Sequence, residues 1–234
     1  MVGGCCSSDG VPNRRTPQDS VVVYNTVTKA WREAPSLNHA RSACIAATVG
    51  GRVYAMGSSS VVESIAQGGA SWREECELPE GAAASASCVL DEKIFIVGPG
   101  GAFSFEPSSG AWDALPPIPG MDGGGVGSAQ VAAHNGCVWV MGGGGGGLVW
   151  SFDPSTREWS AGPELPTAQS WGGAWSVPGV GLLCIGGGHW NDQADTYRLR
   201  GNLKSIYPCF LMDVLIGPQC GTGADMRLIT AASS

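Results

Sequence analysis

The chain has 234 residues, a formal net charge of −7 and only 14% charged side chains. This acidic balance, with Lys and Arg scattered apart from the pair Arg14-Arg15, excludes nucleic acid as the expected partner, since a polyanion needs a basic field. A hydrophobic content of 43% with 37 Gly and 15 Pro predicts a core of many short strands joined by tight turns. No apolar run reaches the roughly 18 residues that span a bilayer, so we expect a soluble, cytoplasmic protein without membrane contact.

Nine cysteines are an odd number and contain no C-x-x-C pair, so neither a disulfide framework nor a zinc site is expected. Four of them lie within apolar strand candidates, where a thiol behaves as a small hydrophobic side chain. We predict that these four are core residues: Cys44, Cys88, Cys137 and Cys184.

The chain opens on a short strand that runs into Gly3-Gly4, followed by strands over 20–24 and 31–34. The eight residues from Tyr24 to Trp31 indicate one turn between two strands. Tyr24 closes the first strand, Asn25 supplies a local side-chain acceptor for the reversal, and Trp31 begins the next strand. No inner strand precedes the first, so this repeat begins partway through.

The same turn returns at 65–72, 105–112 and 152–159, which places tryptophans 41, 40 and 47 residues apart. A second signal with the same period consists of apolar strands that end in glycine. These strands lie at 52–57, 93–98, 137–143 and 182–187.

A strand of small residues precedes each of these apolar strands, at 42–48, 84–90, 128–133 and 173–177. Short turns join the pairs, and Asn135-Gly136 is a strong hairpin signal among them. Four antiparallel strands in 40 to 50 residues are typical of a β-propeller blade. The sequence therefore predicts an all-β propeller over residues 1–200, with blades near 1–35, 37–79, 84–116, 128–166 and 173–199.

The order of a Gly-Gly strand, a Phe-Asp-Pro-Ser-Thr-x-x-Trp turn and a following Leu-Pro resembles the kelch repeat, at the fold level of galactose oxidase-like propellers. The resemblance covers about residues 1 to 200. It implies four-stranded antiparallel blades and places Arg41 at the position of the family's common arginine. The other repeats lack that arginine.

About four blades can be counted, which is fewer than kelch propellers usually have. We expect an incomplete propeller, with a four-bladed ring closed by the two partial repeats as the alternative. A last strand is predicted at 195–199 with no tryptophan strand after it. Residues 201–234 match none of the pattern and are predicted to be a divergent or disordered tail. An open array would expose blade faces and favour dimerisation through its edges.

The shared register of the four repeat tryptophans predicts that they fill the space between adjacent sheets. Trp171 and Trp190 lie outside that register. By strand alternation, the loops after the glycine strands and the loops that lead into the inner strands emerge on one face. Trp, Arg and His in such loops are candidate binding residues. The candidates for partner binding are Arg14, Asn38, His39, Arg41, Trp171, His189, Trp190 and Asp192.

An enzyme is not expected. The three histidines do not cluster, because His134 lies in a hairpin on the opposite face from His39 and His189, so no metal site is predicted. No nucleophile elbow, metalloprotease helix or phosphate loop is present, and the six glycines from Gly142 to Gly147 indicate a flexible loop and no cofactor.

We therefore expect a kelch-repeat protein-interaction module that binds a protein or peptide partner through its loop face. The resemblance implies a substrate-receptor or scaffold role. The alternative is a carbohydrate-active kelch propeller, a sugar mutarotase with Arg41 or Asp192 near the central opening, or a galactose oxidase-like enzyme.

Overall fold

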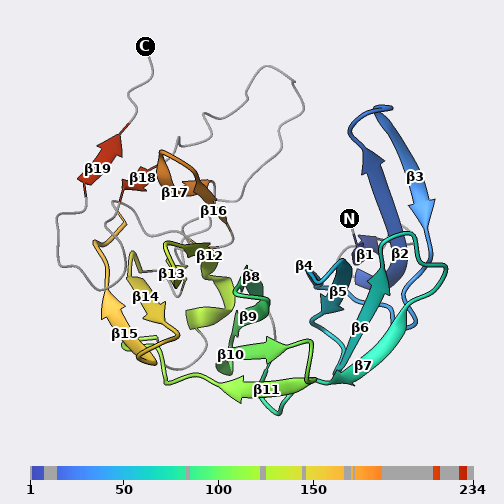
Figure 1. Cartoon of the computed structure of the whole chain (residues 1–234), viewed down its shortest axis with the longest axis horizontal. Helices are drawn as coiled ribbons and strands as arrows, with labels where there is room; N and C mark the ends of the chain where they lie inside the picture. Colours follow the sequence, from blue (N-terminus) through green and yellow to red (C-terminus); the bar gives the residue numbers. More distant parts are fainter. Residues whose placement is uncertain are drawn as a thin grey trace. The chain divides into compact units, whose positions relative to one another are not determined.

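The computed structural model describes residues 2–7, 15–82, 85–121, 125–143, 146–165, 170, 172–185, 213–216 and 227–230. These residues form β-strands and turns, with one short 3-10 turn, η1 (Gly125–Ser128) (Figure 1). The predicted all-β class is confirmed.

Five antiparallel sheets make up the described part of the chain, and within each sheet the strands follow one another in sequence order. The first sheet contains β1 (Val2–Ser7), β2 (Arg15–Asn25) and β3 (Ala30–Ala34). The second contains β4 (Ile45–Val49), β5 (Arg52–Met56), β6 (Val61–Ala66) and β7 (Arg73–Glu77). The third contains β8 (Ala86–Leu90), β9 (Lys93–Gly98), β10 (Gly101–Glu106) and β11 (Ala111–Ala114). The fourth contains β12 (Gln130–His134), β13 (Cys137–Met141), β14 (Val149–Asp153) and β15 (Glu158–Ala161). The fifth contains β16 (Gly173–Val177), β17 (Gly181–Ile185), β18 (Asp213–Ile216) and β19 (Arg227–Thr230).

The chain divides into two compact units, Met1–Leu115 and Pro116–Ser234. In the first unit, one core cluster joins the inner strands of the second and third sheets, with Met56, Ile94, Ile96 and Phe105 nearly or fully buried. In the second unit, β13 packs with residues of β17, such as Leu182 and Cys184. Within each unit, the core therefore lies between neighbouring sheets.

The residue types in the tight turns explain the conformations of these turns. Asn135 and Gly136 both have positive φ, 49° and 75°, as the predicted two-residue hairpin requires. In the Asp153 turn, the carboxylate accepts hydrogen bonds from the backbone N–H and the hydroxyl of Ser155, which also holds the pKa of Asp153 below its usual value. Asn25 caps its turn in the same way, because its side-chain oxygen accepts hydrogen bonds from the backbone N–H groups of Val27 and Thr28.

A regular hydrogen bond links three repeat tryptophans to the segment that follows the tryptophan of the repeat before. Each indole N–H donates to a residue that lies four positions after the tryptophan of the repeat before it. The three bonds run from Trp72 to the carbonyl of Pro35 (2.8 Å), from Trp112 to the sulfur of Cys76 (3.4 Å), and from Trp159 to the carbonyl of Pro116 (2.9 Å). Two of these tryptophans also stack against the aromatic residue that closes the strand before their turn, at centroid distances of 4.7 and 5.0 Å. The predicted position between sheets is confirmed for Trp72 and Trp112, which pack in core clusters that join neighbouring sheets of the first unit.

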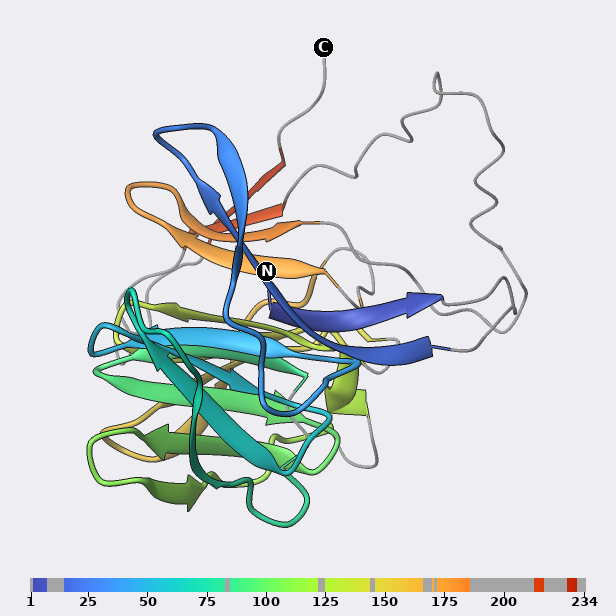
Figure 2. The same cartoon turned by 90° about the vertical axis from the view of Figure 1, so that its right-hand side faces the viewer.

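The prediction is wrong for Trp31, whose relative exposure is 62% against 5% for Trp72. Long strand β2 pairs with β1 up to Val21 and with β3 from Val21 onward. The end of the hairpin that carries Tyr24 and Trp31 is consequently a two-stranded ribbon, which extends beyond β1 in Figure 2. No described sheet precedes it to cover the indole.

The end of the chain contributes to the last sheet. The fifth sheet takes its third and fourth strands, β18 and β19, from the stretch 201–234, which lacks the marker residues of the repeat. Strand pairing depends on backbone groups that every residue carries, so a segment without the repeat's marker residues can still complete a sheet. The strand predicted at 195–199 lies outside the described residues.

The cysteines within strands behave mostly as core residues. Cys184 is buried, and burial raises the pKa of the Cys88 thiol to about 12, which keeps it protonated at neutral pH. Cys44 has a raised pKa for the same reason. Cys137 is fully buried as expected, but it takes part in a disulfide, which corrects the prediction of a free thiol there.

Gly100 is a position where only glycine fits, because a Cβ there would overlap the carbonyl of Gly81. We expect Gly100→Ala to lower the free energy of unfolding by about 1 to 3 kcal/mol, since the added methyl must displace backbone. Urea denaturation measures this change. Gly146→Ala is the matched control, because its Cβ would meet only ordinary contacts at 3.8 Å or more. Equal midpoints for the two variants would contradict the close approach.

Candidate binding site

The connection between β3 and β4 is held in place by its backbone and by one buried side chain. Gln18 and Arg41 exchange two backbone hydrogen bonds, and the N–H of Leu37 donates to the carbonyl of Asp19. Arg41 itself has no exposed surface. Backbone hydrogen bonds alone therefore attach the β3–β4 loop to the first sheet.

The guanidinium of Arg41 joins this loop to the next one. Its Nη1 donates to the carbonyl of Gly57 at 3.0 Å, and its Nη2 donates to the carbonyl of Val61 at 2.5 Å. Nη2 also lies 2.9 Å from Oε2 of Glu63, whose side chain is likewise fully buried. Because both charges are out of water and paired, this ion pair depends on its geometry for stability.

A bulge positions Glu63 inside the sheet. Val62 pairs with Cys76 and Glu63 pairs with Glu74, so Glu75 is an extra residue in β7 at this point. Such a bulge re-aims nearby side chains, and three successive residues of β6, from Val62 to Ser64, are buried here. The Glu63 carboxylate then also accepts the backbone N–H groups of Asn38 and His39 at 2.7 and 3.3 Å.

Asn38 and His39 lie at the surface above this buried pair. The Asn38 amide donates to the carbonyl of Trp72 at 3.2 Å, and His39 Nε2 lies 2.8 Å from a carboxylate oxygen of Glu74. The His39 and Glu74 side chains are 38% and 59% exposed. This outer pair can exchange its partners with solvent or a ligand, whereas the inner pair cannot.

The loop between β5 and β6 is tied to the same structure. The hydroxyl of Ser58 accepts the backbone N–H groups of Ser42 and Ala43, and the hydroxyl of Ser59 accepts the N–H of Val61. Ser58 has a positive φ of 48°, which is uncommon for a residue with a side chain. The two loops thus form one hydrogen-bonded unit.

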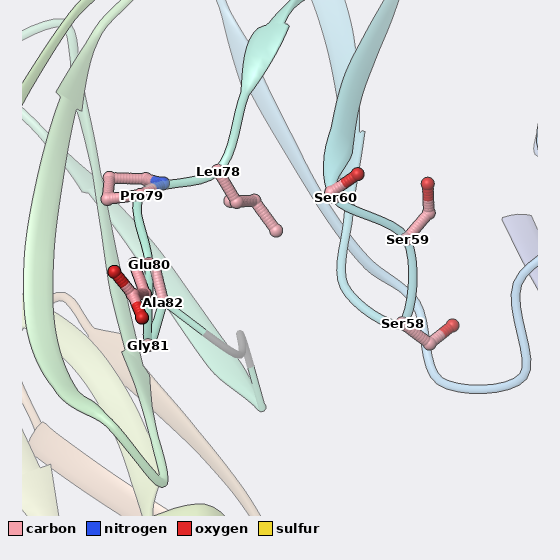
Figure 3. Close-up of a pocket in the computed structure, with 8 residues that line it drawn as sticks. All are labelled: Ser58, Ser59, Ser60, Leu78, Pro79, Glu80, Gly81 and Ala82. Carbon is pink, nitrogen blue, oxygen red and sulfur yellow. The ribbon is translucent and has the colours of Figure 1, made fainter.

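A pocket of about 370 Å³ opens beside this unit, between the loop 58–60 and the segment 78–82 that leads to β8. In Figure 3 the side chain of Leu78 extends toward the serines. Leu78, Pro79 and Ala82 are the apolar lining residues, and the polar lining residues are Ser58, Ser59, Ser60 and Glu80. The carbonyl of Ser60 accepts the N–H of Leu78, which holds the two walls together.

The structure brings three of the sequence-predicted candidates together, Asn38, His39 and Arg41. Of these, Arg41 has no surface to offer a partner, so its contribution is to hold the loops. The remaining candidates lie outside the described residues, and their binding roles stay predictions: Arg14, Trp171, His189, Trp190 and Asp192.

Sequence reasoning missed two parts of this site. Glu63 is the only charged residue between Val61 and Ile65, and a lone carboxylate in a strand is a signal of a buried partner. The run Ser58-Ser59-Ser60 after a glycine strand was the other available signal. Within the described ranges, no group of three His, Cys, Asp or Glu residues could hold a metal ion, and no helix is long and apolar enough to cross a membrane.

The sheets and their regular tryptophan contacts define a kelch-like β-propeller fold. The solved structure titled "Structure of YjhT", a kelch-type propeller protein, matches with a TM-score of 0.69 and 15% identity, over 80% of this chain and 73% of that one. The chain belongs to the family described as "Protein of unknown function (DUF1668)", whose model matches residues 11–166. No curated protein matches the sequence significantly.

Proposed function

We propose that the chain is a protein-interaction module that docks a peptide segment of a partner protein in the pocket between Ser58–Ser60 and Leu78–Ala82. The observation that carries this proposal is the pre-organised wall of the pocket. The buried Arg41–Glu63 pair and the Ser58 hydroxyl hold the loops in one arrangement before any ligand binds. Binding then loses little conformational entropy, which favours affinity.

The lining indicates the chemistry of the segment. Leu78, Pro79 and Ala82 suit one apolar side chain, and serine hydroxyls suit the backbone groups beside it. Glu80 is exposed, and the whole chain carries a net charge of −7. A segment with an apolar residue next to Lys or Arg therefore fits best, because opposite charges steer association.

The experiment is selection of binders from a phage-displayed library of random peptides on the purified full chain. We expect the selected peptides to share an apolar residue beside a basic one. Ser60→Trp should fill the pocket and weaken binding of a selected synthetic peptide about tenfold or more. Glu80→Lys should weaken binding of the same peptide and reduce its salt dependence.

Ser108→Trp is the matched control, because Ser108 is an exposed serine in the turn between β10 and β11, at the other end of its sheet. It should bind the peptide as the unmodified chain does. Selection of peptides that bind Ser60→Trp equally well would show that the pocket is not the docking site.

A further inference from the structure

Two tryptophans are exposed among the described residues, and they lie on the first and the fifth sheets. Trp31 of β3 has a relative exposure of 62%, and Trp175 of β16 has one of 53%. Tryptophan is highly buried on average, and in protein interfaces it is enriched among the residues that contribute most to binding. The sheet faces that carry these two indoles are therefore candidates for contact with another protein.

The third sheet shows what covers a face like the one that carries Trp31. Tyr24 and Trp31 stack at a centroid distance of 5.1 Å, as Phe105 and Trp112 do at 4.7 Å in the third sheet. Phe105 is buried in a cluster with residues of the second sheet, where its ring and that of Tyr54 meet edge-on at 6.0 Å. The cover of this aromatic pair is thus an aromatic side chain of the sheet that comes before it in the chain.

The face that receives a neighbouring sheet also has a recurring composition. In the second and fourth sheets, a small residue of the innermost strand pairs with a large aromatic residue of the next strand. Both residues are buried in a cluster with the sheet that follows in the chain. These pairs are Ala47–Tyr54 and Ala132–Trp139. This face of a sheet therefore presents one aromatic side chain to its neighbour.

The fifth sheet reverses the sizes of the two residues at this position. Trp175 on β16 pairs with Leu183 on β17, so the aromatic residue stands on the innermost strand. Ala174 packs in the cluster with the fourth sheet, and the hydroxyl of Ser176 lies 2.9 Å from Nδ1 of His134. Because side chains alternate along a strand, Trp175 lies on the face turned away from the fourth sheet. The fifth sheet thus leaves exposed the aromatic residue that the second and fourth sheets bury against the next sheet.

We propose that the first sheet of one copy of this chain packs on the fifth sheet of a second copy, with Tyr24 and Trp31 against Trp175. Each copy supplies both halves of the contact, and the halves correspond to the aromatic pair and the aromatic cover that meet between the third and second sheets. Gly173 leaves room for the Trp175 indole to lie against β16, since a Cβ there would overlap the ring. An interface between two different patches either closes into a ring or extends along a chain, and both need the two tryptophans.

Sedimentation equilibrium of the full chain tests this proposal. We expect the unmodified chain to associate with increasing concentration. Trp31→Glu and Trp175→Glu should each raise the dissociation constant about tenfold or more, because each places a charge in an apolar contact. Ala111→Glu is the control, since Ala111 is an exposed apolar residue of the third sheet, which takes no part in the proposed contact. It should associate as the unmodified chain does.

An equimolar mixture of the two deficient variants gives the sharper result. At a concentration at which each is monomeric alone, the mixture should form a heterodimer and nothing larger, because Trp175 of one variant and Trp31 of the other leave one intact contact. Where a glutamate variant does not melt cooperatively, Trp31→Gln or Trp175→Gln replaces it. A monomeric unmodified chain, a variant at Trp31 or Trp175 that associates as strongly as the unmodified chain, or a mixture that stays monomeric would each overturn the proposal.

Discussion

Arg41→Ala should lower the free energy of unfolding by about 3 to 5 kcal/mol, because it leaves the carboxylate of Glu63 buried without its charge partner. Both side chains have no exposed surface, and the guanidinium also satisfies the carbonyls of Gly57 and Val61. Guanidinium chloride denaturation, followed by tryptophan fluorescence, measures the loss. Arg41→Lys should recover only part of it, since an ammonium group lacks the planar fork that reaches several acceptors.

The double replacement Arg41→Met with Glu63→Leu separates the pair from its surroundings. It should cost less than the sum of the two single replacements, because no unpaired charge remains in the interior. Arg73→Ala is the control, since Arg73 pairs with Glu75 at the surface with its side chain 65% exposed. That variant should change stability by about 1 kcal/mol or less. Equal effects of Arg41→Ala and Arg73→Ala would show that the inner pair is not buried in solution.

Trp72→Ala should also cost about 3 to 5 kcal/mol, as expected for removal of a large buried side chain. Trp72 packs with Val21, Leu37 and Ala55, and its indole donates to the carbonyl of Pro35. The loss should appear as a lower denaturation midpoint with an unchanged slope, since the surface exposed on unfolding changes little.

Trp31→Ala is the matched comparison, because it removes the same side chain at the same position of the repeat. At a concentration at which the chain is monomeric, we expect a change within about 0.5 kcal/mol, as for exposed substitutions away from special features. The difference between the two variants measures what the preceding sheet contributes to a repeat. Equal losses would contradict the exposure of Trp31.

The candidate site could be predicted only in part. The interpretation of the loops as one face selected Asn38, His39 and Arg41 as neighbours, because strand alternation settles which loops share an end of a sheet, and their binding role stays a prediction. The sequence could not show that Arg41 is buried while its neighbours are at the surface. That difference depends on the bulge at Glu75 and on the hydrogen bond from the N–H of Ser42 to the hydroxyl of Ser58, which involve residues far apart in sequence. Burial of one residue of the loop, with the adjacent residues left at the surface, is a property of that packing.

Local signals were sufficient for the repeat itself. Turn residues, glycine at the ends of apolar strands and the spacing of the tryptophans depend on φ preferences and on the two-residue period of strands, which act within a few residues. They determined the all-β class, the strand order and the position of the hairpin turns. Only the tertiary structure decided which tryptophan is buried, that β18 and β19 complete the last sheet, and that Arg41 and Glu63 form a fully buried pair. These outcomes depend on contacts between strands and sheets that are distant in sequence. There, the contribution of a side chain to stability depends on the residues it packs against in the folded protein and not on the residues next to it in the sequence.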